Sequence, residues 1–172
     1  MRKLQQQNDL FETIVNDYLN EIRKLVYSYV KNHHTMEEIT QEVFLTAYQK
    51  LDQFRGDSSI KTWLFQIAIN KSKDYLKSWH YRYMSLNQFF QERGTVKSVE
   101  AELIDKQRNQ ELAEAIMSLP VKYREIIILY YYHDLDSNEI SNLLNMNVST
   151  VRTRLTRGRD LIKRRFDIEW TH

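Results

Sequence analysis

Near the end of the chain, arginine and hydroxyl side chains recur at a spacing that gathers them on one face of a helix. Val151, Leu155 and Ile162 form an apolar stripe at helical spacing, so the polar residues fall on the opposite side. An arginine can hydrogen-bond to two acceptors of one guanine, and hydroxyl groups can reach base edges or phosphates. The pattern therefore predicts a helix whose polar face lies in the major groove of DNA. The residues of that face are Ser149, Arg152, Thr153, Thr156, Arg157 and Asp160.

The charge of this segment differs from that of the chain as a whole. Residues 148–165 contain seven basic side chains and one acid, whereas all 172 residues together carry a formal net charge of +2. A solvated helix face is the alternative interpretation of a basic stripe. The concentration of charge favours nucleic acid, because neutralised phosphates supply much of the affinity of DNA-binding proteins.

A second short helix is predicted directly before the basic one. Asp136 can cap its first turn, and Glu139, three residues later, completes a capping box. Ile140, Leu143 and Leu144 form its buried stripe, and residues 145–147 supply the break. Two short helices joined by a tight turn, the second one basic, are typical of a DNA-reading helix-turn-helix.

The composition limits the other possibilities. One proline and three glycines in 172 residues indicate helices throughout, and 42% apolar with 28% charged residues indicates a soluble globular chain. The absence of cysteine excludes disulfides, thiolate metal sites and cysteine catalysis. There is no long apolar run and no leader sequence, so we expect a cytoplasmic protein with no direct membrane insertion.

Apolar periodicity predicts three helices in the first half of the chain. The first covers about residues 9–31, the second begins with a capping box of Thr35 and Glu38, and the third runs from about Ile60 to Trp79, after a loop over residues 52–59. Together they can bury a small core, so residues 1–84 are expected to form a three- to four-helix bundle.

The periodicity fades after the third helix, and we expect a flexible linker over residues 85–105. A second helical domain is predicted over residues 106–172. Its first helix breaks before Pro120, which suits the first turn of the next helix, and Tyr123 to Tyr132 form the apolar centre. The predicted fold class is therefore all-α, with two small helical domains.

Four ordered blocks then make the pattern specific. They are residues 37–45, residues 54–58, residues 62–70, and Leu119-Pro120 with the helix-turn-helix that ends at Val151-Arg-Thr-Arg154. In this order and at these separations the blocks resemble the extracytoplasmic-function sigma factors, which are small two-domain initiation subunits of bacterial RNA polymerase. The resemblance covers about residues 11–82 and 107–165.

The resemblance implies that the loop and the third helix capture the promoter's minus-ten element as unwound single strand. Such binding needs cations along the backbone and aromatic faces for the bases. Asn70 matches the family's base-contacting position, and the alternative is that it caps a local break in the helix. Trp79 could belong either to this site or to the core. The expected minus-ten residues are Phe54, Arg55, Lys61, Asn70, Lys71, Lys73, Lys77, Trp79, Tyr81 and Arg82.

The resemblance also implies that the second helix binds core RNA polymerase. The family usually has Asp where Glu38 stands, and this departure favours Gln41 and Glu42 as the contacts. Phe44 could instead be a core residue. The expected polymerase-binding residues are Glu38, Gln41, Glu42, Phe44 and Leu45.

In the second domain, the resemblance implies that the basic helix reads the minus-thirty-five element as duplex DNA. We expect Arg152, Thr153 and Arg157 at base edges. The residues expected to contact this element are Ser149, Thr150, Arg152, Thr153, Arg154, Thr156, Arg157, Arg159 and Lys163, of which Arg154, Arg159 and Lys163 are expected to hold phosphates.

Members of the family are typically held inactive by an anti-sigma protein, often bound to the membrane, so such a partner is implied. No cofactor, metal or catalytic residue is expected. A helix-turn-helix regulator with an N-terminal ligand or dimerisation domain is the first alternative, and it leaves the basic and aromatic segment 54–83 without a role. An enzyme is the second, but the five histidines show no helix-spaced pair with a carboxylate and there is no glycine-rich phosphate loop.

Overall fold

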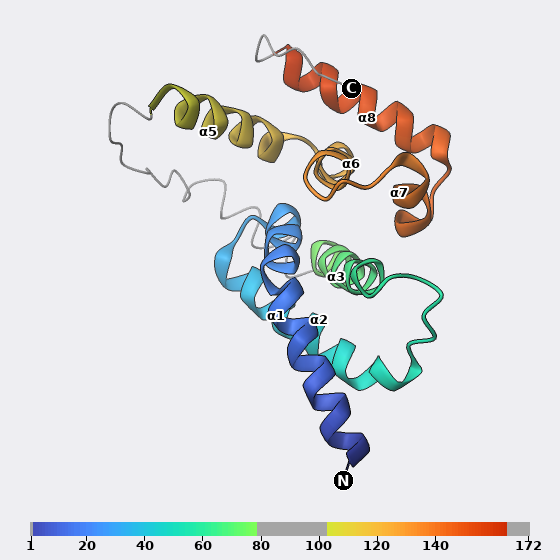
Figure 1. Cartoon of the computed structure of the whole chain (residues 1–172). Coiled ribbons are helices and arrows are strands. Elements are labelled where there is room, and N and C mark those ends of the chain that lie inside the picture. Colours follow the sequence, from blue (N-terminus) through green and yellow to red (C-terminus); the bar gives the residue numbers. More distant parts are fainter. Residues whose placement is uncertain (1, 79–102, 165–172) are drawn as a thin grey trace. The chain divides into compact units, whose positions relative to one another are not determined.

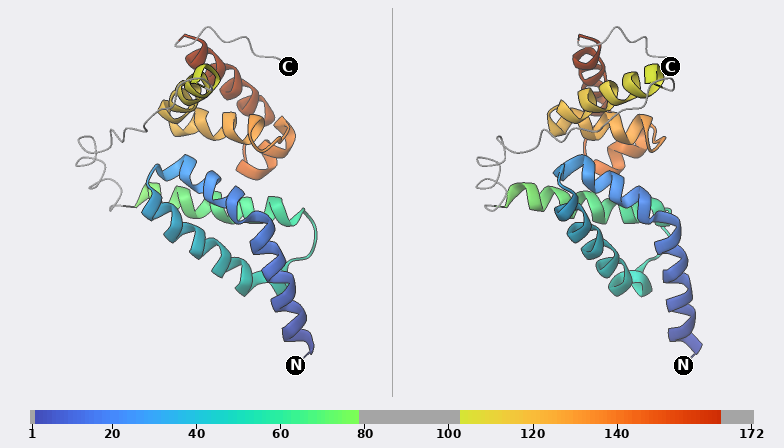
Figure 2. Two further views of the ribbon diagram at one scale, coloured as in Figure 1. Left: turned by 60° about the vertical axis from the view of Figure 1, so that its left-hand side comes forward. Right: turned by 90° about the vertical axis from the view of Figure 1, so that its left-hand side faces the viewer.

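The computed structural model describes residues 2–78 and 103–164, and all regular structure within them is helical (Figure 1; two further views in Figure 2). The predicted all-α class is confirmed. The elements are α1 (Arg2–Val30), α2 (His33–Lys50), the 3-10 turn η1 (Leu51–Gln53), α3 (Ile60–Lys77), α5 (Leu103–Ser118), α6 (Val121–Tyr131), α7 (Ser137–Leu144) and α8 (Val148–Lys163).

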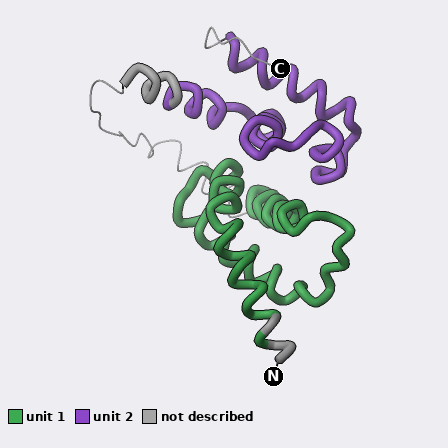
Figure 3. Tube along the Cα trace, in the orientation of Figure 1, with its two compact units in different colours: residues 1–82 green, residues 83–172 purple. Residues whose placement is uncertain are grey.

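The chain divides into two compact units, residues 1–82 and residues 83–172 (Figure 3). The first contains α1, α2, η1 and α3, and the second contains α5 to α8. Most of the linker expected over residues 85–105 lies outside the described residues. Its last three residues, 103–105, belong to the first turn of α5.

Unit 1 is a bundle in which α1, α2 and α3 pack against one another. Fully buried side chains come from all three helices, among them Ile22, Val43 and Phe65. Their helical spacing explains why each helix forms, because each apolar stripe is removed from water by the other two. The first turns of α1 project beyond α2 and α3 (Figure 2), and its first described buried residue is Ile14.

The start of α2 differs from the prediction. The N-cap is Asn32, whose side-chain oxygen accepts a hydrogen bond of 2.9 Å from the backbone N–H of Thr35. The expected capping box of Thr35 and Glu38 is therefore wrong. Asparagine is as good an N-cap as threonine, and starting at Asn32 adds helical residues and their hydrogen bonds. Glu38 is consequently an exposed mid-helix residue, 3.4 Å from His34.

Unit 2 is built around α6, whose central residues Ile126, Ile127 and Leu129 are almost fully buried. Pro120 is the N-cap of α6 and so stands one position earlier than the predicted first turn. Arg124 is also buried, and its guanidinium donates to the carbonyl oxygens of Met117 (2.7 Å) and Leu119 (3.0 Å). These bonds fix the end of α5 against the beginning of α6, because the last carbonyls of a helix lack partners within it.

Candidate nucleic-acid interface

The turn between α7 and α8 fixes the direction of the basic helix. The capping box of α7 is confirmed: Asp136 accepts from the backbone of Glu139 (2.9 Å), and the Glu139 carboxylate accepts from the backbone of Asp136 (2.8 Å). The helix ends at Asn145 in the left-handed region with φ of 50°, where asparagine is better tolerated than most residues. The Ser141 hydroxyl then donates to the Met146 carbonyl (2.6 Å). These local bonds define the helix-turn-helix.

Gly158 lets α8 lie close to α6. A Cβ atom at this position would stand 2.9 Å from Cγ1 and 3.1 Å from Cδ1 of Ile127, which is nearly fully buried. These distances are shorter than an ordinary van der Waals contact between carbon atoms. Only glycine therefore fits this crossing without displacing the core.

The polar face of α8 is exposed as the sequence predicts. Ser149, Arg152, Thr153, Thr156, Arg157 and Lys163 are exposed, and Thr150 is half-buried. The hydroxyl of Thr153 donates to the Ser149 carbonyl (2.9 Å), and that of Thr156 donates to the Arg152 carbonyl (3.1 Å). These hydroxyls thus retain acceptor lone pairs toward solvent.

Two arginines of α8 are held by α6. The guanidinium of Arg154 lies 3.6 Å from the carboxylate of Glu125, which is only 4% exposed. The guanidinium of Arg159 stands 5.7 Å from the ring centre of Tyr130 and 5.4 Å from that of Tyr131. Spacing along α8 could not reveal these partners, because they come from another helix. Both residues have structural contacts in addition to the phosphate role expected of them.

The loop before α3 places an aromatic pair at the start of that helix. Phe54 and Trp63 lie with ring centroids 5.0 Å apart, and both are half-buried. Between them Gly56 adopts φ of 77°, a conformation that costs glycine little. Arg55 is exposed beside this turn. Part of the Phe54 ring thus packs against Trp63, and the rest is exposed to solvent.

Asn70 lies exposed on α3, which continues without a break to Lys77. The alternative that Asn70 caps a local break is therefore wrong. An exposed asparagine within a helix interior is a weak helix former with no structural task that the described contacts reveal. This position is compatible with the expected contact to a base.

Acidic residues of neighbouring helices face two of the lysines on α3. Lys61 lies 2.9 Å from Glu21 of α1, and Lys71 lies 3.1 Å from Glu42 of α2. Lys73 is half-buried, and Lys77 is exposed, 3.8 Å from Asp74. The other expected minus-ten residues, Trp79, Tyr81 and Arg82, lie outside the described part of the chain.

The residues of α2 that are expected to contact polymerase are of two kinds, exposed and buried. Glu38, Gln41, Glu42 and Leu45 are exposed, and Leu45, at 58%, is the most exposed large apolar side chain of the described residues. Phe44 is 7% exposed and packs edge-on against Phe11, with centroids 6.4 Å apart. Phe44 is therefore a core residue at the base of a surface formed by the others.

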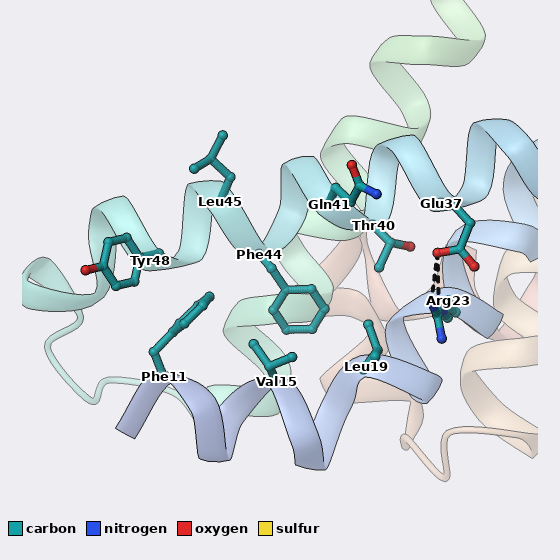
Figure 4. A pocket seen from close by; sticks show the side chains of 10 residues that line it. All are labelled: Phe11, Val15, Leu19, Arg23, Glu37, Thr40, Gln41, Phe44, Leu45 and Tyr48. Atoms are coloured by element: carbon teal, nitrogen blue, oxygen red, sulfur yellow. Dashed lines mark hydrogen bonds and ion pairs between the residues drawn. The ribbon is translucent and has the colours of Figure 1, made fainter. Parts of the chain in front are cut away.

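An apolar groove of about 550 Å³ lies between α1 and α2 (Figure 4). Phe11, Val15 and Leu19 line its α1 side, opposite Phe44 and Tyr48 of α2, and the Arg23–Glu37 ion pair of 3.0 Å closes one end. The sequence predicted that the first three helices bury a small core together, but it did not predict that part of the apolar side of α1 lines an open groove. The apolar stripe of α1 is wider than one helix neighbour can cover.

Other kinds of site are not seen in the part of the chain that the structure describes. Within residues 2–78 and 103–164, no group of three or more histidines and carboxylates is placed to hold a metal ion. Among the same residues, no helix has both the length and the apolar character needed to span a membrane.

Comparison with known proteins gives two family matches that together cover most of the chain. The model described as Sigma-70 region 2 matches residues 14–80, and the one described as Sigma-70, region 4 matches residues 109–162. The first therefore contains α2, η1, α3 and most of α1, and the second contains the helix-turn-helix.

Individual relatives are similar over nearly their whole length. The ECF RNA polymerase sigma factor SigW of Bacillus subtilis is 32% identical over 91% of this chain and 88% of its own. The ECF RNA polymerase sigma-E factor of Escherichia coli K12 is 33% identical over 88% of this chain and 84% of its own. The sigma factor RpoE from Bartonella quintana, solved with the anti-sigma factor NepR, superposes with a TM-score of 0.75 at 21% identity, over 93% and 98% of the two chains.

Proposed function

The chain belongs to the sigma-70 family, within it to the extracytoplasmic-function RNA polymerase sigma factors, and from this premise we propose that its two units share the recognition of one promoter. A sigma factor directs core RNA polymerase to promoters and helps to open the DNA there. The observation that carries the proposal is the exposed arginine and hydroxyl face of α8, held out by a capped helix-turn-helix. The boundaries that we propose are residues 1–84, 85–105 and 106–172.

We assign the minus-thirty-five element to unit 2. Arg152 is exposed in the centre of the α8 face and has no carboxylate partner among the described residues, so it is free to bridge two acceptors of a guanine. Thr153 and Thr156 are exposed beside it. Arg154 and Arg159 are tied to α6, which supports a role in orienting α8 and in contacting the DNA backbone rather than the bases.

We assign the minus-ten element to the loop and α3 of unit 1. Asn70 is the proposed base contact, and the Phe54–Trp63 pair offers a partly open aromatic face near the start of the helix. Lys61 and Lys71 provide cations that can exchange their carboxylate partners for phosphates of an unwound strand. Trp79, Tyr81 and Arg82 complete the proposed site from the segment that follows α3.

We propose that core polymerase binds the outer face of α2. Gln41, Glu42 and Leu45 are exposed there, and exposed apolar area next to polar groups is typical of a protein interface. The groove between α1 and α2 continues this surface through Gln41 and Leu45, which line it. Phe44 supports the surface from beneath.

Regulation and location follow from the same family. We propose that an anti-sigma protein binds this chain, which the Bartonella quintana complex of a similarly folded sigma factor supports. Attachment of that partner to the membrane is a further proposal. The chain would act in the cytoplasm, where RNA polymerase acts, and it would contribute no catalysis of its own, since the polymerase performs the chemistry.

The test is run-off transcription with purified core polymerase on a fragmented genomic library. Asn70→Ala and Arg152→Ala are compared with wild type, and Asn16→Ala and Lys50→Ala, both exposed outside the proposed sites, are the matched controls. We expect discrete starts that require the protein, a shared pair of upstream elements, and losses in the first two variants only.

A helix-turn-helix regulator would give a different result. The protein alone would bind duplex fragments tightly, and core polymerase would gain no promoter specificity from it. That outcome would remove both the sigma function and the role of Asn70.

A further inference from the structure

An open polar pocket lies beside the polar face of α8, where the beginning of α6 approaches it. Its volume is about 330 Å³. Lys122 and Tyr123 line it from α6, and Ser149, Thr150, Thr153, Arg154 and Arg157 line it from α8. Three of these side chains are cationic, four carry a hydroxyl group, and none is a carboxylate. The lining therefore suits a small anionic group.

Two of the three cations have no carboxylate partner among the residues that the structure describes. Arg154 is paired with Glu125 at 3.6 Å, but neither Lys122 nor Arg157 forms an ion pair with a carboxylate of the described residues. Lys122 is exposed, with its ammonium 5.0 Å from the ring centroid of Tyr123. Like charges left facing one pocket repel each other, and an anion between them would relieve that repulsion.

Tyr123 lines the pocket together with Lys122 and Arg157. A hydrogen bond from the Arg157 side chain and the nearby charge of Lys122 lower the pKa of the Tyr123 hydroxyl from its ordinary value of 10.0. A phenol can donate its O–H to an anion, so Tyr123 adds a hydrogen-bond donor to the two cations that line the pocket with it. An ammonium, a guanidinium and a phenol thus converge with the hydroxyls of α8.

The position of the pocket indicates which anion it would meet. Ser149, Thr153 and Arg157 belong both to the pocket and to the exposed face that carries Arg152. A duplex whose major groove holds that face would pass one sugar-phosphate backbone along the side of α8, and backbone contacts at groove edges position a recognition helix.

We propose that Lys122, Tyr123 and Arg157 together bind one backbone phosphate of the duplex read by α8. The site rests on the proposed function of unit 2 and adds to it two α6 residues and a changed role for Arg157. Arg157 holds a phosphate, and Arg152 remains the arginine at the base edge. The anion is a phosphodiester with two non-bridging oxygens, which the guanidinium and the ammonium can share.

The first experiment needs no promoter. The full chain is titrated with a 25-base-pair duplex of random sequence at several salt concentrations, and the variants are Lys122→Ala, Tyr123→Phe and the matched control Lys50→Ala, an exposed lysine of unit 1. One lost phosphate contact should reduce the slope of log affinity against log salt by about 0.9 in Lys122→Ala. Tyr123→Phe should weaken binding several-fold with the slope kept, and the control should match wild type.

The second experiment locates the phosphate. Promoter duplexes obtained with the holoenzyme carry single methylphosphonate substitutions, each of which neutralises one phosphate. At one position wild type should lose affinity several-fold while Lys122→Ala loses nothing further, and base preference should stay unchanged in both.

The inference and the function can fail separately. If Lys122→Ala and Tyr123→Phe keep the wild-type slope and affinity while Arg152→Ala loses promoter-specific transcripts, the phosphate site is wrong and the sigma function stands. If no promoter-specific transcripts form at all, the random duplex still tests the site. Thermal unfolding of each variant checks that a loss of binding is not a loss of fold.

Discussion

The guanidinium of Arg154 lies 3.6 Å from the carboxylate of Glu125, and the two differ sharply in exposure: Arg154 keeps 30% of its side chain in solvent and Glu125 keeps 4%. The pair joins the DNA-facing helix to the central helix of unit 2. A buried carboxylate needs a compensating charge, so this arginine supports the fold whether or not DNA is present.

Arg154→Ala should therefore lower the stability of the protein, whereas Arg152→Ala should not. Removing Arg154 takes away a charge that compensates the buried Glu125 carboxylate, and because Arg154 is partly exposed we expect a loss of about 2 kcal/mol, below the cost for a fully buried pair. Thermal unfolding measures it. Glu125→Gln in the Arg154→Ala background should recover part of the loss. If Arg154→Ala and Arg152→Ala were equally stable, the structural role of Arg154 would be contradicted.

Gly158→Ala should also destabilise unit 2, although alanine is the better helix former by about 1 kcal/mol. The new methyl would stand 2.9 Å from Cγ1 of Ile127, and overpacking of a tight core costs roughly 1–3 kcal/mol. Chemical denaturation of Gly158→Ala, Ile127→Ala and the double variant forms a complete cycle. The loss of stability caused by Gly158→Ala should be smaller when Ile127 is replaced by alanine. An unchanged loss would show that the contact with Ile127 is not its cause.

Asp136→Ala should weaken the helix-turn-helix by about 1 kcal/mol, the usual value of an N-cap. Its carboxylate accepts from two backbone N–H groups, those of Asn138 (2.7 Å) and Glu139 (2.9 Å). Amide exchange should accelerate in the first turn of α7. Asp160→Ala removes an exposed acid on α8 and is the matched control. If the amides of α7 were as protected in Asp136→Ala as in wild type, the prediction would be contradicted.

Substitutions of Leu45 and Phe44 should have different effects, the first on polymerase binding and the second on stability. Leu45→Ala removes a side chain that is 58% exposed, so it should reduce affinity for core polymerase and leave the unfolding temperature unchanged. Phe44→Ala removes a buried ring and should cost about 3 kcal/mol of stability. Core-binding assays and thermal scans on both variants make the comparison. An unaltered affinity in Leu45→Ala would place the polymerase surface elsewhere.

The pKa of the Tyr123 hydroxyl should lie below its ordinary value of 10.0. The hydrogen bond from Arg157 lowers its pKa by stabilising the phenolate, so Arg157→Ala should move the pKa back up. A bound phosphate should raise it, because two anions would then share the pocket. Titration of ¹³C-labelled tyrosine, with Tyr123→Phe to assign the signal, follows these shifts. Without that lowered pKa in the free protein, the described arrangement of Arg157 would be wrong.

Local chemistry was the part that the sequence predicted well. The Asp136–Glu139 capping box, the break at Asn145 and the apolar stripes of the helices depend on residues within a few positions of one another. The start of α2 was missed because Asn32 and Thr35 are both competent N-caps, and the sequence alone does not weigh three more helical residues against the alternative.

The sequence predicted which face of each helix carries the site residues, but not which residues of neighbouring helices those side chains contact. The polar side of α8 is where periodicity places it, yet the Arg159 contacts with Tyr130 and Tyr131 and the Lys61 pair with Glu21 depend on how helices cross. Spacing reports direction around one helix axis and carries no information about the neighbouring helix. The pocket that joins Lys122 to Arg157 was missed for the same reason.

The carboxylates of Glu21 and Glu42 beside Lys61 and Lys71 bear on how the free protein searches for its target. In the proposed minus-ten site, a phosphate that binds either lysine would first displace an internal carboxylate, so the net gain from contact with an arbitrary strand would be small at these two positions. Under that proposal, the two ion pairs would shorten the residence of the free protein on random single strands.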